Sequence, residues 1–220
     1  MVVLLIALTF AVMVLIDHLS LRQPVVIAEA TPTEKKPART PALIAGFELR
    51  PNLKYHPGHM WAVAETPELV RIGADDFAMK VAGHTTGIEI PERGQWIRQG
   101  QKIIAMHRDG GDLELVSPIE GTVVDVNEAA TRNPEAARND PYGDGWLLVV
   151  NSPDAKTNFR NLLSGTVAKR WLDDAAARLR NYVQTPAMNV AQDGGVALDN
   201  ALELLPRDQW TKIEQELFLL

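Results

Sequence analysis

The chain has 220 residues, a formal net charge of −6 and no cysteine. This acidic balance argues against a nucleic-acid-binding protein, which needs a basic face. The lack of cysteine excludes disulfides, thiolate nucleophiles and cysteine-ligated zinc or iron–sulfur clusters.

The N-terminal segment is apolar. Its first 16 residues, MVVLLIALTFAVMVLI, carry no charge. A 16-residue helix spans about 24 Å, and extension through Leu21 reaches the ~30 Å of a hydrocarbon core. We therefore predict a transmembrane anchor over residues 1–21. A cleaved signal peptide is the alternative, with Ala28-Glu29-Ala30 as a cleavage site, although such peptides usually begin with basic residues.

The charges that flank this segment predict its orientation. No Lys or Arg precedes it, whereas Arg22, Lys35, Lys36 and Arg39 follow it. Because positively charged flanks stay cytoplasmic, we expect a single-pass protein of the inner (cytoplasmic) membrane with its main domain in the cytoplasm. Residues 22–49 are rich in Pro, Thr, Ala and charge without an apolar period, which predicts an extended linker.

The next part of the chain alternates short apolar runs with turn residues. LVRIG (69–73), LELVSPIEGTVVDVN (113–127) and WLLVVN (146–151) have the composition of strands. DDFAMKVAG (75–83) reads as a short helix, capped by an aspartate at its start and ended by glycine. Short strands at this even spacing predict a mainly β fold, a small antiparallel barrel or sandwich.

The order of several motifs resembles the H-protein of the glycine cleavage system. The segments are YHPGHMWA (55–62), VRIGADDFA (70–78), IPERGQWIRQGQ (90–101), SPIEGTVVDVNEA (117–129), NPE (133–135) and DPYGDGWLLVV (140–150). The resemblance implies a lipoyl-type antiparallel β barrel-sandwich with flanking helices over residues 50–180. It also implies a carrier domain whose hairpin tip bears one lipoylated lysine.

That lysine is missing from this chain. The tip of the expected hairpin reads Asp109-Gly110-Gly111-Asp112, and the family's lysine position falls on Gly110 when counted from Gly100 or back from Ser117-Pro118. The acidic residue that the family places upstream, and that modifying enzymes recognise, falls on His107. Glycine has no amine to acylate, so we expect a preserved hairpin, whose Asp-Gly favours a tight turn with positive φ, and no bound cofactor.

The other candidates for chemistry are weak. His56 and His59 in HPGH match no established metal motif, and the resemblance places His59 at a structural strand entry. Asp109, Asp112 and Glu114 read as a solvated acidic loop, with too few oxygen ligands for calcium. No order of residues resembles a catalytic triad. We therefore expect no metal, no catalytic residue and no small-molecule substrate: the protein is not an enzyme.

The C-terminus adds helices beyond the family unit. VAKRWLDDAAARLRNYV (167–183) carries one apolar stripe: Val167, Trp171, Ala175, Leu179 and Val183. Residues 181–220 form an extension in which VALDNALELL and RDQWTKIEQELFLL read as two further short helices. The apolar residues at its end are Trp210, Ile213, Leu217, Phe218 and Leu220. They suit either a helical cap on the barrel or an arm that docks on a partner; for residues 196–220 we expect burial against a neighbouring subunit.

Two functions follow from these features. The first is a membrane-anchored, non-catalytic subunit that uses a degenerate H-protein-like domain to dock on or stabilise a larger membrane-associated complex, such as an electron-transfer or photosynthetic assembly. The second is a carrier or accessory protein of a lipoate- or glycine-cleavage-type pathway, against which the missing lysine counts.

Overall fold

A computed structural model of the chain describes residues 41–183, 201–202 and 205–219. The predicted anchor over residues 1–21 lies outside these ranges. Within them, no helix combines the length and the apolar character that crossing a bilayer requires.

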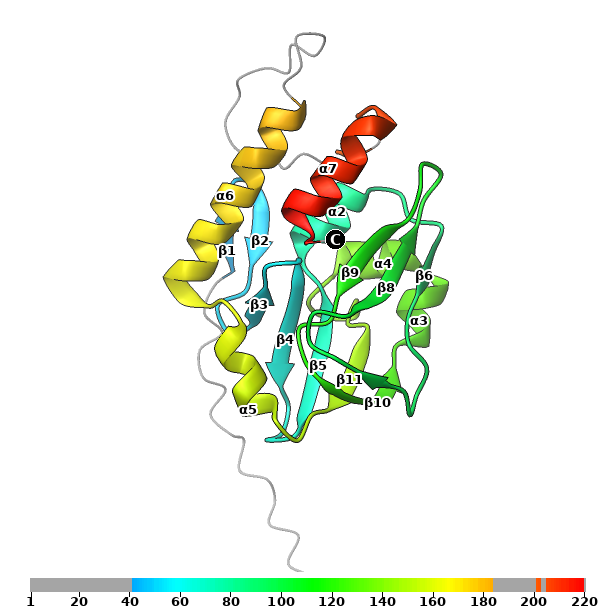
Figure 1. The fold of residues 1–220 in the computed structure, drawn as a ribbon, viewed down its shortest axis with the longest axis vertical. Coiled ribbons are helices and arrows are strands. Elements are labelled where there is room, and N and C mark those ends of the chain that lie inside the picture. Colours follow the sequence, from blue (N-terminus) through cyan, green and yellow to red (C-terminus); the bar gives the residue numbers. More distant parts are fainter. Residues whose placement is uncertain (1–40, 184–200, 203–204, 220) are drawn as a thin grey trace, which may run out of the picture. The chain divides into compact units, whose positions relative to one another are not determined.

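The body of the protein is built from antiparallel strands, as predicted (Figure 1). A six-stranded sheet has the order β3-β4-β5-β11-β10-β7, a three-stranded sheet has the order β6-β8-β9, and β1 pairs with β2. The strands are β1 (Ala42–Ile44), β2 (Phe47–Leu49), β3 (Lys54–His56), β4 (Met60–Ala64), β5 (Leu69–Ala74), β6 (Gly87–Glu89), β7 (Trp96–Ile97), β8 (Lys102–His107), β9 (Leu113–Val116), β10 (Gly121–Val126) and β11 (Leu148–Asn151).

Helices flank the sheets. They are α2 (Asp76–Ala82), α3 (Glu128–Arg132), α4 (Pro134–Asn139), α5 (Ala155–Asn158), the 3-10 turn η1 (Phe159–Asn161), α6 (Gly165–Val183) and α7 (Arg207–Leu217). Figure 1 shows α6 beside β1 and β2, and α7 between α6 and the β8–β9 hairpin. The largest side chains of the core are aromatic, among them Trp61, Tyr55, Phe47, Phe77 and Phe218.

The start of the folded unit differs from the prediction. Residues 42–49, which we expected within the linker, form the β1–β2 hairpin. Its two turn residues, Ala45 and Gly46, have φ of 50° and 91°, the left-handed backbone that two-residue hairpin turns use. Phe47 and Leu49 are buried in the core. The hairpin is therefore part of the folded domain, and residues 42–49 do not belong to the predicted linker.

The predicted helix over 75–83 is confirmed as α2. The carboxylate of Asp75 accepts a hydrogen bond from the Ala78 amide at 2.8 Å, which is the usual N-cap arrangement. Gly83 ends the helix with φ of 73° and donates its amide to the Met79 carbonyl. Local sequence therefore fixes both ends of this element.

The motif around residues 127–146 has a structural explanation. Asn127 donates its side-chain amide to the carbonyls of Asp144 and Trp146, at 2.8 and 2.7 Å, and accepts from the Ala130 amide at the start of α3. Tyr142 donates its hydroxyl to the Glu48 carbonyl at 2.6 Å and accepts from the Asp76 amide at 3.1 Å. These bonds link the loop before β11 to β2, α2 and α3. Asn127 and Tyr142 therefore have a structural role, which is to hold these strands and helices in position.

The C-terminal helices agree with the prediction only in part. In α6, Ala175, Leu179 and Val183 are buried as expected, but Val167, in the first turn, is 61% exposed. The predicted helix over RDQWTKIEQELFLL is confirmed as α7. The preceding one is not seen where the chain is described, since Ala201 and Leu202 lie in a turn.

Candidate functional site

The β8–β9 hairpin carries the candidate site. Its strands pair from Lys102↔Val116 to Met106↔Leu113, and the turn closes with a hydrogen bond from the Gly111 amide to the Arg108 carbonyl at 3.1 Å. The positive φ that we expected at this turn belongs to Gly111, at 128°, and not to Gly110. The backbone at Gly110 therefore does not require glycine.

The space above Gly110 is filled by the indole of Trp210 from α7. A Cβ atom built on Gly110 would lie within 2.7 Å of three carbons of that ring, a distance that real Cβ atoms essentially never show. The place where any side chain at this position would start is therefore occupied by another residue of the same chain. Glycine is required here for space and not for conformation.

Three contacts hold Trp210 in this position. Its indole N–H donates to the Leu205 carbonyl at 3.0 Å. The guanidinium carbon of Arg108 lies 4.5 Å from the ring centroid, an attractive cation–π distance. Arg207, one turn earlier in α7, donates to the Asp109 carbonyl at 3.5 Å. The indole is thus anchored both within the tail and to the hairpin turn.

The rest of α7 is packed into the same domain. Ile213, Leu217 and Phe218 are 0%, 3% and 0% exposed and belong to the core cluster. The Phe218 ring lies 5.2 Å from His59 and 6.2 Å from Phe77, centroid to centroid. For these residues the expectation of a partner-docking arm is wrong: the apolar stripe is buried within the chain, as the alternative of a helical cap had it. Leu220 lies outside the described residues.

Two acidic side chains of the hairpin, Asp112 and Glu114, lie beside a histidine and a lysine. His107, at the family's acidic position, has Nδ1 2.9 Å from Asp112 and Nε2 3.6 Å from Glu89. Lys102 contacts Glu114 at 2.5 Å. Within the described ranges, no three histidine or acidic residues come together in a way that could hold a metal ion. The arrangement at the tip is therefore one of surface ion pairs around a closed position.

The two histidines of HPGH have separate structural roles. His59 is fully buried, with Nδ1 2.9 Å from an Asp75 oxygen and its ring stacked on Phe77 at 4.0 Å. His56 accepts a hydrogen bond from the Gly58 amide through Nδ1 at 3.0 Å. Burial, with a smaller contribution from nearby His59, lowers the pKa of His56 to about 4.

The contact between Trp210 and Gly110 was not predicted from the sequence. The periodicity of residues 207–217 indicated an amphipathic helix, but it carried no information about the surface that its apolar face covers. The sequence did contain a clue: it has a bulky residue, Trp210, in the tail and a glycine, Gly110, at a position where the family has a long side chain. Only the three-dimensional structure brings the two together.

Comparison with known proteins identifies the family. The profile described as "Glycine cleavage H-protein" matches residues 53–175, more than half of the chain. The chain belongs to the glycine cleavage H-protein family. The range agrees with the residues 50–180 over which the motifs resemble that family, and it includes the hairpin with Gly110.

Individual relatives agree with this assignment. A probable glycine cleavage system H protein of Aeropyrum pernix is 32% identical over 118 residues, which cover 54% of this chain and 81% of that protein. The glycine cleavage system H protein of Saccharophagus degradans is 36% identical over 107 residues, covering 49% and 82%. A crystal structure of the Mycobacterium marinum H protein has a TM-score of 0.45 at 27% identity, covering 48% of this chain and 87% of that one.

Family membership supports a lipoyl-carrier-type domain. The family's lysine position corresponds to Gly110 in this chain, and α7, which covers it, lies beyond the matched residues. This member of the H-protein family therefore has a hairpin tip with glycine at position 110, covered by the indole of Trp210.

Proposed function

We propose that this chain is a non-lipoylated, membrane-anchored interaction subunit that docks on or stabilises a larger membrane-associated complex. The observation that carries the proposal is Gly110 at the carrier position with the Trp210 indole seated on it. A group-carrying domain needs an exposed amine on a swinging side chain, and here both the amine and the space for it are absent. A fold kept without its carried group is best suited to binding other proteins.

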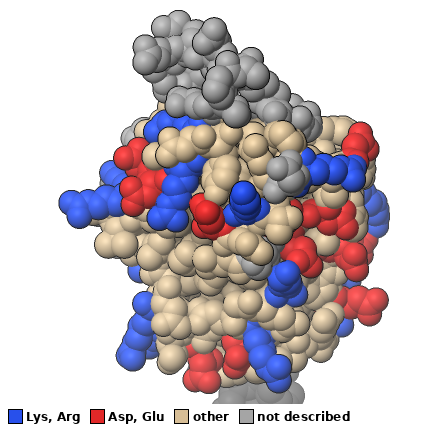
Figure 2. Space-filling view, turned by 45° about the horizontal axis from the view of Figure 1, so that its top comes forward, with Lys and Arg blue, Asp and Glu red and all other residues tan. Residues whose placement is uncertain are grey.

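The uncharged residues 1–16 support the anchor, and the cationic residues that follow them support an orientation with the domain in the cytoplasm. The tail no longer supports docking, because Ile213, Leu217 and Phe218 are buried within the same domain. Contact with partners then falls to the outer surface of the domain. On the face drawn in Figure 2, basic and acidic residues are interspersed, a pattern suited to protein partners rather than to nucleic acid.

A second function is an accessory or carrier protein of a glycine-cleavage-type pathway. It is favoured by the family match, which runs through the hairpin, and by relatives that are glycine cleavage system H proteins over more than 80% of their length. The glycine at position 110 restricts this alternative to roles that do not use a lipoyl group at the family site.

Intact mass spectrometry tests whether the chain carries a lipoyl group. The full chain is co-expressed with a lipoate–protein ligase and lipoate, beside the H protein of Saccharophagus degradans as a positive control. We expect the control to gain one lipoyl mass and this chain to gain none. A lipoyl adduct on any lysine of this chain would contradict the proposal.

Two variants show whether the closed tip itself prevents modification. Gly110→Lys alone supplies the amine beneath Trp210, and Gly110→Lys combined with Trp210→Ala also opens the space. We expect the double variant to be lipoylated more than the single one, and incompletely, because His107 stands where the enzymes expect an acidic residue. Cross-linking of the native chain in its own membrane, followed by mass spectrometry, then identifies the subunits that it contacts.

A further inference from the structure

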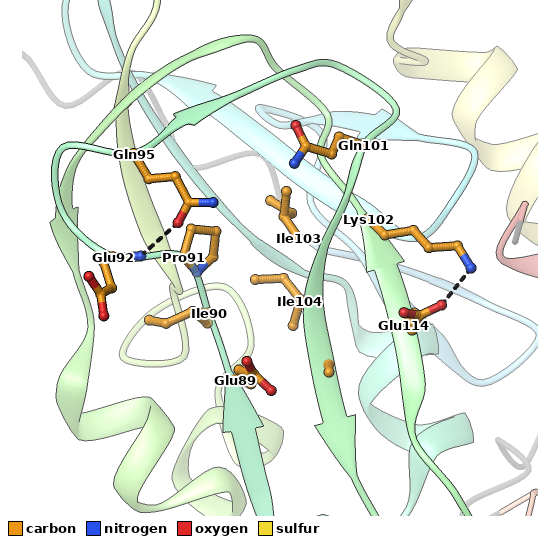
Figure 3. Close-up of a pocket in the computed structure, with 11 residues that line it drawn as sticks. Glu89, Ile90, Pro91, Glu92, Gln95, Gln101, Lys102, Ile103, Ile104 and Glu114 are labelled. Atoms are coloured by element: carbon orange, nitrogen blue, oxygen red, sulfur yellow. Dashed lines mark hydrogen bonds and ion pairs between the residues drawn. The ribbon is translucent and has the colours of Figure 1, made fainter.

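A groove lies along one side of β8, away from the closed tip. Its volume is about 460 Å³, and the segment from Glu89 to Gln95 forms its opposite wall (Figure 3). Ile90, Pro91 and Ile103 supply apolar surface inside it, whereas Glu89 and Glu92 are exposed at its rim. The groove is thus a shallow, open slot whose lining is more polar than apolar, with these three apolar side chains inside it and an acidic edge.

One wall of this groove is a strand edge that no described strand pairs with. The pairing of β6 with β8 stops at Glu89↔Ala105, so within the described residues no strand lies beside residues 102–104 of β8 on that side. The segment that follows β6 cannot continue the ladder there, because Pro91 has no backbone N–H. The β8–β9 register also shifts between Lys102 and Ile104, a bulge that leaves Ile103 out of that ladder.

The charges at the rim are unbalanced. Lys102, the basic residue of the lining, is held by Glu114 at 2.5 Å. Arg93, next to Glu92 in sequence, turns away to pair with Asp125 at 2.8 Å. Within the described residues no Lys or Arg forms an ion pair with Glu89 or Glu92, and Glu89 has only His107 at 3.6 Å. The rim therefore favours a cationic occupant.

We propose that this groove binds an extended peptide segment of a partner protein, in which apolar residues alternate with lysine or arginine. The backbone of the segment pairs with the open edge of β8, as in other cases of strand addition. Its apolar side chains lie on Ile90, Pro91 and Ile103, and its cationic side chains face Glu89 and Glu92. The inference rests on the proposed function, because it names the kind of partner segment that this chain would bind as an interaction subunit.

The test uses a fluorescein-labelled, end-capped heptapeptide of alternating lysine and valine, and the full chain in mild detergent. Anisotropy titrations measure its affinity for the native chain and for Glu92→Lys, with Glu68→Lys as the matched control, since Glu68 is exposed and outside the groove. Because an exposed ion pair contributes up to about 1 kcal/mol and the new lysine also repels the peptide, we expect Glu92→Lys to weaken binding by about three- to tenfold, and Glu68→Lys to leave it within twofold. The peptide with glutamate in place of lysine is expected to bind at least tenfold more weakly than the lysine peptide.

Two further measurements test the mode of binding. N-methylation of alternate peptide amides should abolish binding, because it removes the donors needed for strand pairing. The chain contains no cysteine, so a chloroacetyl group on the peptide should alkylate Gln95→Cys in the groove and spare Asp154→Cys outside it.

The proposal is overturned if the lysine peptide does not bind, if Glu92→Lys and Glu68→Lys bind it equally, or if the N-methylated peptide binds as well as its parent. These results are independent of the lipoyl assay. If the chain is not lipoylated and does not bind the peptide, the groove proposal is wrong and the proposed function still stands. If the chain is lipoylated, the proposed function is wrong.

Discussion

Replacing Gly110 with alanine should lower the free energy of unfolding, because the new methyl group would collide with the indole ring of Trp210. The new methyl group would fall within 2.7 Å of three Trp210 carbons, so either the ring or the hairpin must move. Overpacking of this kind costs about 1–3 kcal/mol. If the indole leaves instead, the chain loses a hydrogen bond to Leu205 worth ~1 kcal/mol and a cation–π contact with Arg108 worth about 0.5–1 kcal/mol. Both routes give a destabilisation of roughly 1–3 kcal/mol.

The assay is equilibrium unfolding in urea, followed by tryptophan fluorescence. Gly87→Ala is the matched control, because a Cβ there would meet only His107 Cδ2, at an ordinary 3.6 Å, and its cost should be that of a surface change, within ~0.5 kcal/mol. A double-mutant cycle isolates the contact: in a Trp210→Ala background, Gly110→Ala should cost less than about 0.5 kcal/mol. An equal cost of Gly110→Ala in both backgrounds, or no cost in the native one, would refute the steric reasoning.

Three other measurements check separate parts of the structure. Phe218→Ala should lower the free energy of unfolding by about 3–5 kcal/mol because the ring is fully buried, whereas Leu219→Ala, at a position that is 53% exposed, should change it by less than ~0.5 kcal/mol; similar costs for the two would contradict the packing of α7. Burial holds the pKa of His56 at about 4, below the ~6.5 of histidine in an unfolded chain. As the pH falls, the unfolded state therefore takes up the proton first. The contribution of His56 to stability should be complete above pH ~6.5 and should fall by up to ~3 kcal/mol as the pH drops toward 4. His56→Gln should flatten this part of the pH profile, and an unchanged profile would argue against the assignment. Protease added to intact cells should leave residues 47–220 uncut if the anchor has the proposed orientation; external digestion, or a mature N-terminus at residue 31, would reverse it.

The features that were predictable from the sequence are those with a local cause. The ends of α2 follow from a capping aspartate and a terminating glycine, and the β8–β9 hairpin follows from two strand-like runs around small turn residues. In each of these cases, neighbouring residues carry the whole reason for the structure.

The features that were missed depend on contacts between distant residues or on very short elements. The β1–β2 hairpin has strands of three residues and an alanine in a left-handed turn conformation, which a proline-rich context obscures. Val167 has the period of a buried residue but lies in the first turn of α6, where it is exposed. The target of α7 is the hairpin about 100 residues earlier, and no local pattern can indicate such a partner.

The distance in sequence between Trp210 and Gly110 has a consequence for the protein during and just after its synthesis. The β8–β9 hairpin leaves the ribosome well before α7, because synthesis runs from the N-terminus and α7 lies about 100 residues later in the chain. Contacts of such long sequence separation are slow to form. In each newly made chain the hairpin tip is therefore exposed until α7 packs on it. A protein that recognised the exposed tip would bind only newly synthesised chains.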